Sequence, residues 1–197
     1  MAGTGTVHMM VDIETLSTHN NAHILCASLV PFFPEGDSHL FRENVENYTP
    51  WTYGLHPNAQ PGRHIDPRTV SWWFGQSSVA QARVNHLWQG GSSETFDSAH
   101  AFCNSMAGKI VLAQPELIWA KSPTFDLAIL RDLFYSCGVE VPWKFYEERD
   151  VRTAQEASPG HKALDTLEEG EAHDPLYDCK VQAYTVQKFY RSIRSAE

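Results

Sequence analysis

The sequence predicts one α/β domain whose mixed sheet of five strands is flanked by helices. Two observations predict this class. Three apolar segments of strand length open the chain, and strand and helix patterns alternate from residue 116 onward, an order typical of α/β domains. The chain has 197 residues, of which 42% are hydrophobic, which suits one domain with a large core. We therefore treat residues 1–197 as a single domain.

The first three strands are expected to form an antiparallel meander. The first is "VHMMVDIETLS" at 7–17, where apolar residues surround two acids. "HILCASLVPFF" at 23–33 and "HLFRENV" at 39–45 follow, with the turn residues "PEGDS" between them. Strand patterns joined by such a turn predict a hairpin.

The next part of the chain predicts a long loop and two helices. Residues 46–66 hold three prolines and two glycines without clear periodicity, and a loop of this length is usually functional or mobile. A helix is expected over 66–77, with Asp66 as its N-cap and a proline at the first helical position. A second helix is expected over 92–108, ending at Gly108.

The second half of the chain alternates between strand and helix patterns. Its last helix opens with Asp174 as a cap and Pro175 at the first helical position. The expected segments are a buried strand at 116–122, an amphipathic helix at 123–138, a strand at 143–151 and a long helix at 174–193.

Charge and cysteine content narrow the classes of function. The formal net charge is −9, which argues against a protein that grips a long nucleic-acid backbone but not against an enzyme that holds only a chain end. The four cysteines lie far apart without a C-x-x-C pair, a spacing that fits neither a zinc site nor a disulfide framework. Neither a signal peptide nor a segment of membrane-spanning length is visible. We expect a soluble, cytoplasmic protein.

Two acids in the first strand are the first candidates for chemistry. Asp12 and Glu14 are two residues apart, so their side chains leave a strand on the same face. Like charges side by side repel, and burial increases the cost. A D-x-E triplet is nevertheless expected about once by chance in a chain of this composition, and a strand at a sheet edge would leave both acids in water.

Further candidates stand at two helix starts. Asp126 lies in the first turn of a helix that directly follows a strand. The helix dipole alone favours an acid there, but ligand sites also form at such junctions. His173 precedes the last helix, and it is the only one of ten histidines with an aspartate, Asp178, five residues downstream. A lone His–Asp pair is more often a surface hydrogen bond, so the combination of all five residues carries the signal.

This combination resembles the three motifs of the DEDDh family of 3′→5′ exonucleases. The acids at 12 and 14, "FD" at 125–126 and H-x-x-x-x-D at 173–178 match in order and spacing. "RTVSWWFGQS", "RDVRT" and "AHDPLYDCKVQA" are similar to phage and prophage exonucleases of the T-even exodeoxyribonuclease A group, and to its mycobacterial exoribonuclease. Position 174 is an aspartate and not the tyrosine of the sister DEDDy class. The resemblance implies a ribonuclease H-like fold and leaves the choice between DNA and RNA open.

The resemblance also implies a two-metal site. Four carboxylates in one cleft need cations to stay ionised together, and oxygen ligands suit Mg²⁺ or Mn²⁺. By resemblance, Asp12 bridges two such ions, Glu14 and Asp178 complete the first, and Asp126 holds the second through water. His173 is the implied general base.

A second histidine competes with His173 for the role of base. His161 lies in "GHKALD", which imitates the H-x-A-L-x-D pattern of related enzymes. Five residues after His161 stands Thr166, so the carboxylate is missing. We therefore favour His173.

The residues that follow the first acids are expected to bind the terminal nucleotide. In relatives this segment, here Thr15 and Leu16, cradles the 3′ nucleotide, and Leu16 is placed to wedge against the last base. Phe125, Trp72 and Trp73 are candidate stacking surfaces, although all three are also suitable core residues.

The sequence therefore predicts a metal-dependent 3′→5′ exonuclease that releases nucleoside 5′-monophosphates from DNA or RNA ends. The alternatives are an oligoribonuclease-like phosphodiesterase for short oligomers and a non-catalytic nucleic-acid-binding module on the same fold. The expected partners are nucleic-acid 3′ ends and, as an open question, a second copy in a homodimer. A phage-encoded protein of this kind would work in the host cytoplasm.

Overall fold

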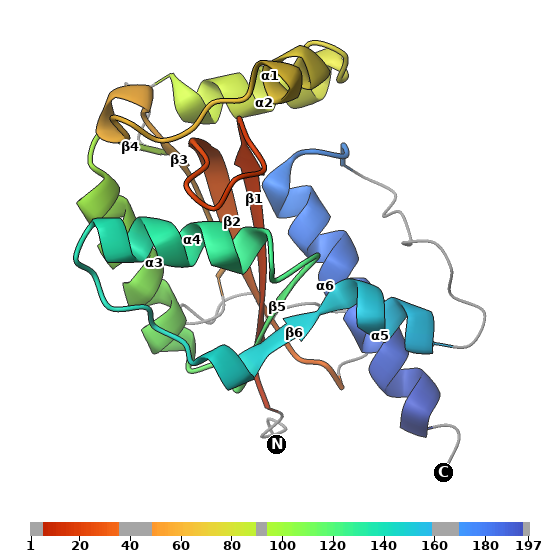
Figure 1. The fold of residues 1–197 in the computed structure, drawn as a ribbon. Helices are drawn as coiled ribbons and strands as arrows, with labels where there is room; N and C mark the ends of the chain where they lie inside the picture. The colour runs from red at the N-terminus through yellow and green to blue at the C-terminus, as the bar shows by residue number, and fades with distance from the viewer. Residues whose placement is uncertain (1–5, 36–48, 90–93, 159–169, 195–197) are drawn as a thin grey trace.

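The computed structural model describes residues 6–35, 49–89, 94–158 and 170–194, which form one sheet with helices on both faces (Figure 1). The α/β class with a mixed sheet is confirmed, but the sheet has six strands and not five. The strands are β1 (His8–Thr15), β2 (Ile24–Phe32), β3 (Trp51–Leu55), β4 (Thr95–Phe96), β5 (Leu117–Ala120) and β6 (Glu148–Asp150).

Strand β1 lies inside the sheet, whose order is β4-β3-β2-β1-β5-β6. β1, β2 and β3 pair antiparallel, whereas β5 pairs parallel to β1 and β6 parallel to β5. The carboxyl ends of β1, β5 and β6 therefore meet at one edge of the sheet, where α/β proteins place their ligand sites.

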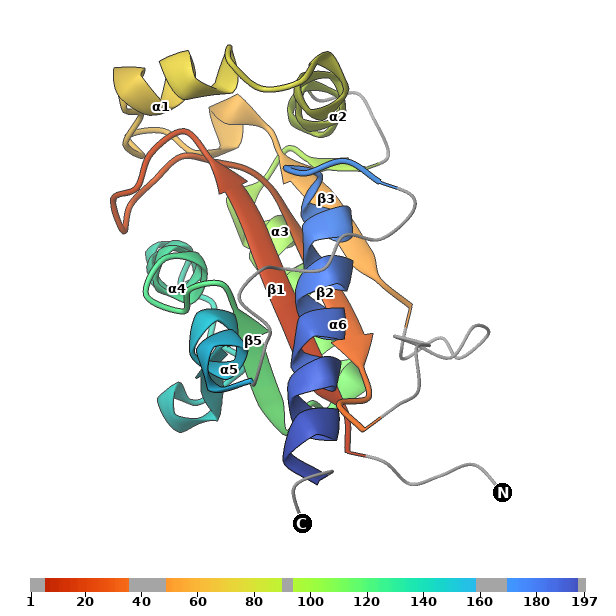
Figure 2. The ribbon, with the colours of Figure 1, turned by 90° about the vertical axis from the view of Figure 1, so that its right-hand side faces the viewer.

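The helices cover both faces and one end of the sheet. Helices α3 and α4 lie on one face, α5 and α6 on the other, and α1 and α2 cross the end where β1 finishes (Figures 1 and 2). Within the described ranges the helices are α1 (Pro67–Trp73), α2 (Ser78–Trp88), α3 (Ala99–Ala113), α4 (Asp126–Ser136), α5 (Val151–Ala157) and α6 (Pro175–Arg194), with the short 3-10 turns η2 (Pro57–Ala59) and η3 (Phe145–Glu147). None of the described helices is long and apolar enough to cross a membrane.

The alternation of side chains along β1 divides the core. Met9 and Val11 pack in the cluster formed with α3 and α4, whereas Met10 packs in the cluster formed with α5 and α6. By the same alternation Asp12 and Glu14 face the α6 side. Both side chains are buried in an interior strand. The alternative that β1 lies at a sheet edge, with both acids in water, is therefore wrong.

The expected caps of α1 and α6 are confirmed. The carboxylate of Asp66 accepts the backbone N–H of Arg68, and that of Asp174 accepts the N–H of Leu176. A proline follows each cap at the first helical position, where its missing N–H costs nothing.

Several boundaries differ from the sequence expectations. The range 46–66, expected as a loop, contains β3 and η2, because pairing with β2 makes a strand that local composition does not indicate. Helix α3 continues past Gly108 to Ala113, since burying Ile110 and Ala113 outweighs the cost of an interior glycine, about 1 kcal/mol. The strand expected at 39–45 lies outside the described residues. Helices α2 and α5 and strand β4 were not expected.

Candidate active site

Four carboxylates from three distant segments meet at the carboxyl end of β1. Asp12 and Glu14 come from β1, Asp126 is the first residue of α4, and Asp178 lies in the first turn of α6. Asp12, Glu14 and Asp126 are no more than 9% exposed. The charges of Asp126 and Asp178 both act on Asp12, so the structure brings the expected acids together.

This crowding changes the acidity of each group. Burial, reinforced by the neighbouring acids, raises the pKa of Asp12 and of Glu14 well above the usual range. Burial also raises the pKa of Asp126 to about 7 and raises the pKa of Asp178. The ionised forms of the four acids repel one another, and a cation bound in the cleft would offset this repulsion.

The two carboxylate oxygens of Asp126 have different surroundings. The backbone N–H of Ile13 donates to Oδ1 at 3.2 Å. Oδ2 is buried and has no hydrogen-bond partner among the residues that the structure describes. Buried acceptors are normally satisfied, and an unsatisfied carboxylate oxygen beside three other acids fits a hard divalent cation or its bound water.

Gln182 is a site residue that the sequence reasoning missed. Its Nε2 donates to Asp12 Oδ1 at 2.8 Å in a buried position, which fixes the orientation of that carboxylate. Gln182 stands four residues after Asp178 on α6, so both side chains face the same way. The spacing was visible, but a glutamine in a helix is too common to mark a site on its own.

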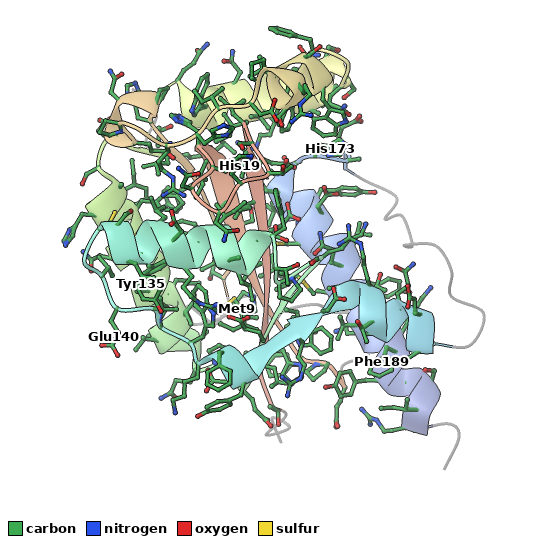
Figure 3. All side chains as sticks on the ribbon, viewed as in Figure 1. Met9, His19, Tyr135, Glu140, His173 and Phe189 are labelled. Carbon is green, nitrogen blue, oxygen red and sulfur yellow. The ribbon has the colours of Figure 1, made fainter. Side chains whose placement is uncertain are left out.

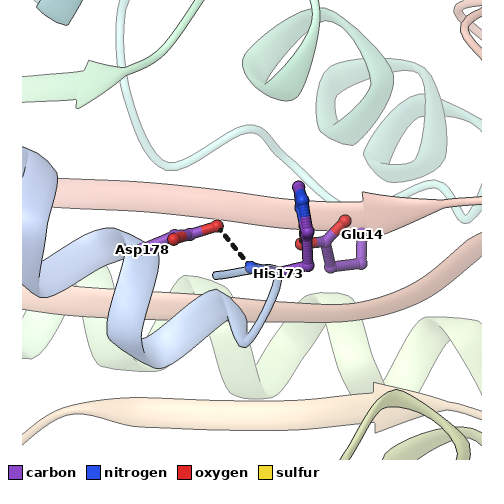
Figure 4. Close-up of side chains that lie close together, drawn as sticks. All are labelled: Glu14, His173 and Asp178. Atoms are coloured by element: carbon purple, nitrogen blue, oxygen red, sulfur yellow. Dashed lines mark hydrogen bonds and ion pairs between the residues drawn. The ribbon is translucent and has the colours of Figure 1, made fainter. Parts of the chain in front are cut away.

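His173 lies beside the carboxylates, above the start of α6 (Figures 3 and 4). Its Nδ1 is 3.9 Å from Glu14 Oε1, and its backbone N–H donates to Asp178 Oδ2 at 3.0 Å. Potential ligand atoms of Glu14, His173 and Asp178 all lie within 4.8 Å of one another. The rings of Trp72 and Trp73 meet the imidazole edge-on, with centroids 4.9 and 6.1 Å away. The competing His161 lies outside the described residues.

A cavity of about 560 Å³ opens beside Glu14. Two of the expected substrate-binding residues, Thr15 and Phe125, line it, and Trp72 is 46% exposed at its wall. The side chain of Arg68 is largely exposed and pairs with Asp66 at 2.9 Å. The lining residues are Glu14, Thr15, Thr18, Asp66, Arg68, Thr69, Trp72 and Phe125.

The other two expected substrate-binding residues line a different cavity. Leu16 and Trp73 are each 8% exposed and border a second cavity, of about 720 Å³, between α1 and α2. The indole N–H of Trp73 donates to the carbonyl oxygen of Thr15 at 2.9 Å. Because consecutive residues of a helix point about 100° apart, Trp72 faces the first cavity while Trp73 packs beneath it. The Trp73 side chain is therefore largely buried, whereas that of Trp72 is 46% exposed.

Comparison of the sequence with known proteins finds two relationships. The profile of a family described as "3′-5′ exoribonuclease Rv2179c-like domain" matches residues 7–190. The exodeoxyribonuclease of Enterobacteria phage T4 is 26% identical over 194 residues, which cover 86% of this chain and 83% of the phage protein.

Comparison of the fold finds exonuclease I. A product-bound exonuclease I superimposes with a TM-score of 0.64 at 12% identity, covering 98% of this chain and 45% of that one. E. coli exonuclease I in complex with a dT13 oligonucleotide gives 0.63 at 12% identity, covering 97% and 42%. The chain therefore spans less than half the length of these structures, and at this identity the likeness is one of fold.

Proposed function

The chain belongs to the family of 3′-5′ exoribonuclease Rv2179c-like domains, and from this premise we propose that it is a divalent-metal-dependent exonuclease that shortens DNA or RNA from the 3′ end and releases nucleoside 5′-monophosphates. One observation carries the proposal. Four acids converge with a histidine next to an open cavity, although their burial raises the pKa of each acid. A protein that only bound nucleic acid would need no such concentration of acids.

We assign the metal site to the four carboxylates. Asp12, Glu14, Asp126 and Asp178 would hold two ions, Mg²⁺ or Mn²⁺, through oxygen atoms. When bound, such ions lower the pKa of a water and stabilise charge on the scissile phosphate. The unsatisfied Oδ2 of Asp126 and the all-oxygen set of acids support the assignment.

His173 is the proposed general base that takes a proton from the attacking water. Its backbone is tied to Asp178, and two indole rings meet its imidazole. These contacts fix the ring next to Glu14, and the His173 side chain stays 35% exposed. A positioned imidazole of this kind typically contributes about 10²–10⁴ in rate.

The first cavity is the proposed site for the terminal nucleotide. The exposed ring face of Trp72 and the neighbouring Phe125 offer stacking surfaces for a base. Thr15 contributes its backbone and hydroxyl to the wall, although its hydroxyl already donates to the carbonyl oxygen of Ser17 at 2.7 Å. Leu16 and Trp73, from the second cavity, support this wall from behind.

The alternative of an oligoribonuclease-like enzyme for short oligomers is favoured by charge. A net charge of −9 gives weak attraction for a long phosphate backbone. A dependence of rate on substrate length separates the two enzymes, because the short-oligomer enzyme slows sharply beyond a few nucleotides.

The direct test is digestion of matched DNA and RNA oligomers that carry a 5′ label, with Mg²⁺, Mn²⁺ or excess chelator. We expect stepwise loss of 3′ nucleotides with either metal, none in chelator, and protection by a bulky 3′ block but not by a 5′ block. Asp126→Asn serves as the inactive control. Equal digestion of the 3′-blocked and the 5′-blocked oligomers would identify an endonuclease, and full activity after exhaustive chelation would remove the metal assignment.

A further inference from the structure

Lys121 stands beside the four carboxylates, directly after strand β5. In the parallel register, Met10 of β1 lies opposite Trp119 of β5. Two residues further along each strand come Asp12 and Lys121. Side chains alternate along strands, so we expect Lys121 on the same face of the sheet as Trp119. Trp119 packs with Met10 in the core cluster formed with α5 and α6. This is also the face of Asp12, which meets Gln182 of α6.

The charge of Lys121 acts on three of the four acids without being committed to one of them. Its ammonium group interacts electrostatically with Asp12, Asp126 and Asp178. Within the described part of the chain, however, it makes no hydrogen bond and no direct ion pair. The basic side chains of Arg63 and Arg83 differ, because each forms a direct ion pair. Lys121 is only partly buried, so its amine remains accessible.

A second cation, Arg152, stands on the same side. It lies in the first turn of α5, just after β6, whose Asp150 pairs with Ala120 of β5. Its charge acts on Asp126 and on Lys121. Its side chain is exposed and, in the residues described, forms no ion pair either. Two uncommitted cations thus flank a cluster of acids, which is an arrangement suited to an incoming anion.

We propose that Lys121 is a catalytic residue whose ammonium group donates hydrogen bonds to a non-bridging oxygen of the scissile phosphate and to the phosphate of the 5′-monophosphate product. The inference rests on the proposed exonuclease function and deepens it. Ammonium–phosphate hydrogen bonds are charge-assisted and strong, and donors aimed at developing charge stabilise a transition state. Arg152 adds positive charge that acts on Asp126.

The step leaves Lys121 unchanged. The oxygen of the attacking water forms a bond to phosphorus, and the bond from phosphorus to the 3′ oxygen of the preceding nucleotide breaks. The proton of the water passes to His173, and the departing oxygen takes a proton from solvent. Lys121 keeps its three protons throughout and compensates the charge on the phosphate oxygens.

The test compares Lys121→Met and Lys121→Arg with wild type and with Lys144→Met, a control in the exposed turn beside Tyr146. Removal of one such donor typically costs about 10²–10³ in kcat, and we expect a loss of this order in Lys121→Met on a 3′-hydroxyl oligomer. Lys121→Arg should recover part of the lost rate. Lys144→Met should stay within about twofold of wild type, because Lys144 is not proposed to contact the phosphate.

Two binding measurements separate a phosphate contact from a merely structural role. By calorimetry in Mn²⁺, Lys121→Met should bind deoxythymidine 5′-monophosphate about tenfold more weakly, a loss typical of one charge-assisted hydrogen bond, and should bind unphosphorylated thymidine as wild type does. Its affinity for Mn²⁺ itself should stay equal or increase, because a neighbouring positive charge is removed. Circular-dichroism melts confirm that each variant is folded.

Unchanged binding of the monophosphate by Lys121→Met, or an equal loss for thymidine, would overturn the role of Lys121. If wild type digests oligomers and Lys121→Met does so at the same rate, only this inference fails. If wild type digests none of them with either metal, the proposed function fails, and the binding measurements still decide whether Lys121 contacts a phosphate.

Discussion

Asp12 places an ionisable carboxyl in a buried position of the protein. It lies in an interior strand with helices over both faces, and among the described residues only Gln182 donates to its carboxylate from a side chain. Burial and two neighbouring acids raise the pKa of this carboxyl well above its usual range. Burying such a group without compensation costs stability. At the residue scale, the site is therefore a region that lowers the stability of the fold, and the proposed cations would offset this cost.

Replacement of this one acid should stabilise the metal-free protein. We expect Asp12→Asn to keep the hydrogen bond from Gln182, to relieve repulsion from the other acids, and to raise Tm in EDTA by a few degrees, equivalent to roughly 1 kcal/mol. The variant should be inactive and should gain little Tm from Mn²⁺. Scanning calorimetry with and without Mn²⁺ checks this, with the exposed Asp97→Asn as the matched control. A lower Tm in EDTA than wild type would contradict the electrostatic account.

The identity of the general base is a second question at the scale of single residues. His173→Ala should lose about 10²–10⁴ in kcat while the carboxylates still bind Mn²⁺. His161→Ala should stay within a few-fold of wild type, because no aspartate follows it at the required spacing. The test measures single-turnover rates of both variants and their binding of Mn²⁺ by calorimetry. The reverse pattern would place the base twelve residues earlier in the chain.

At the scale of elements, the packing of helix α2 on strand β3 depends on one point where the two backbones come very close. A side-chain carbon added at Gly54 of β3 would lie 1.5 Å from the carbonyl oxygen of Leu87 in α2. That oxygen also accepts the hydroxyl of Thr95 at 2.8 Å. The two backbones can pack this closely only because residue 54 has no side chain.

Gly54→Ala should therefore push α2 away from the sheet. We expect a loss of about 2 kcal/mol or more in the free energy of unfolding, in line with overpacked core positions. Urea titration gives the value, and Gly108→Ala provides the control, because open space surrounds that helical position and alanine favours a helix. Equal stability of Gly54→Ala and wild type would mean that α2 is more loosely docked than described.

The elements that could be predicted are those with strong periodicity or caps. β1, β2, β5 and α6 were expected because apolar runs and the Asp174 cap mark them. β3 was missed, since its short segment contains Gly54 and becomes a strand only by pairing with β2. In the site, the acids were visible as a pattern of motifs. Gln182 and Lys121 could not be recognised in this way. Their roles arise from the packing of α6 and β5 against β1, and no spacing along the chain indicates that packing.

At the scale of the whole molecule, two buried groups give opposite pH dependences. His8 is buried, and its Nδ1 accepts the indole N–H of Trp119 at 3.0 Å. Burial, with the charge of Arg149, lowers the pKa of His8 to about 4. The unfolded state therefore binds a proton that the folded state excludes, and stability falls as pH drops from about 6.5 toward 4. Asp126, with a pKa of about 7, binds its proton more tightly when folded, so its contribution is lost as pH rises from about 4 to 7.

In metal-free wild-type protein the raised pKa values of the four carboxyls act against the lowered pKa of His8, so the free energy of unfolding should fall as pH rises from 4.5 to 7.5. In His8→Gln the free energy of unfolding should fall with rising pH by about 2 kcal/mol more than in wild type, and in Asp126→Asn the slope should shift by a similar amount in the opposite direction. Urea titrations in EDTA at pH 4.5, 6 and 7.5 make the comparison. Parallel profiles for wild type and His8→Gln would show that His8 is not held neutral by the fold.

The order of the elements along the chain determines when the proposed enzyme becomes able to cut. β1, which carries two of the acids, is synthesised first, and α6, which carries Asp178 and follows His173, is the last of the described elements. A growing polypeptide that has not yet released α6 from the ribosome holds at most three of the four acids and lacks the proposed base. On the proposed function, the nascent chain would therefore be inactive toward nucleic acids during its own translation, and activity would arise only when the last helix docks onto β1 and β2.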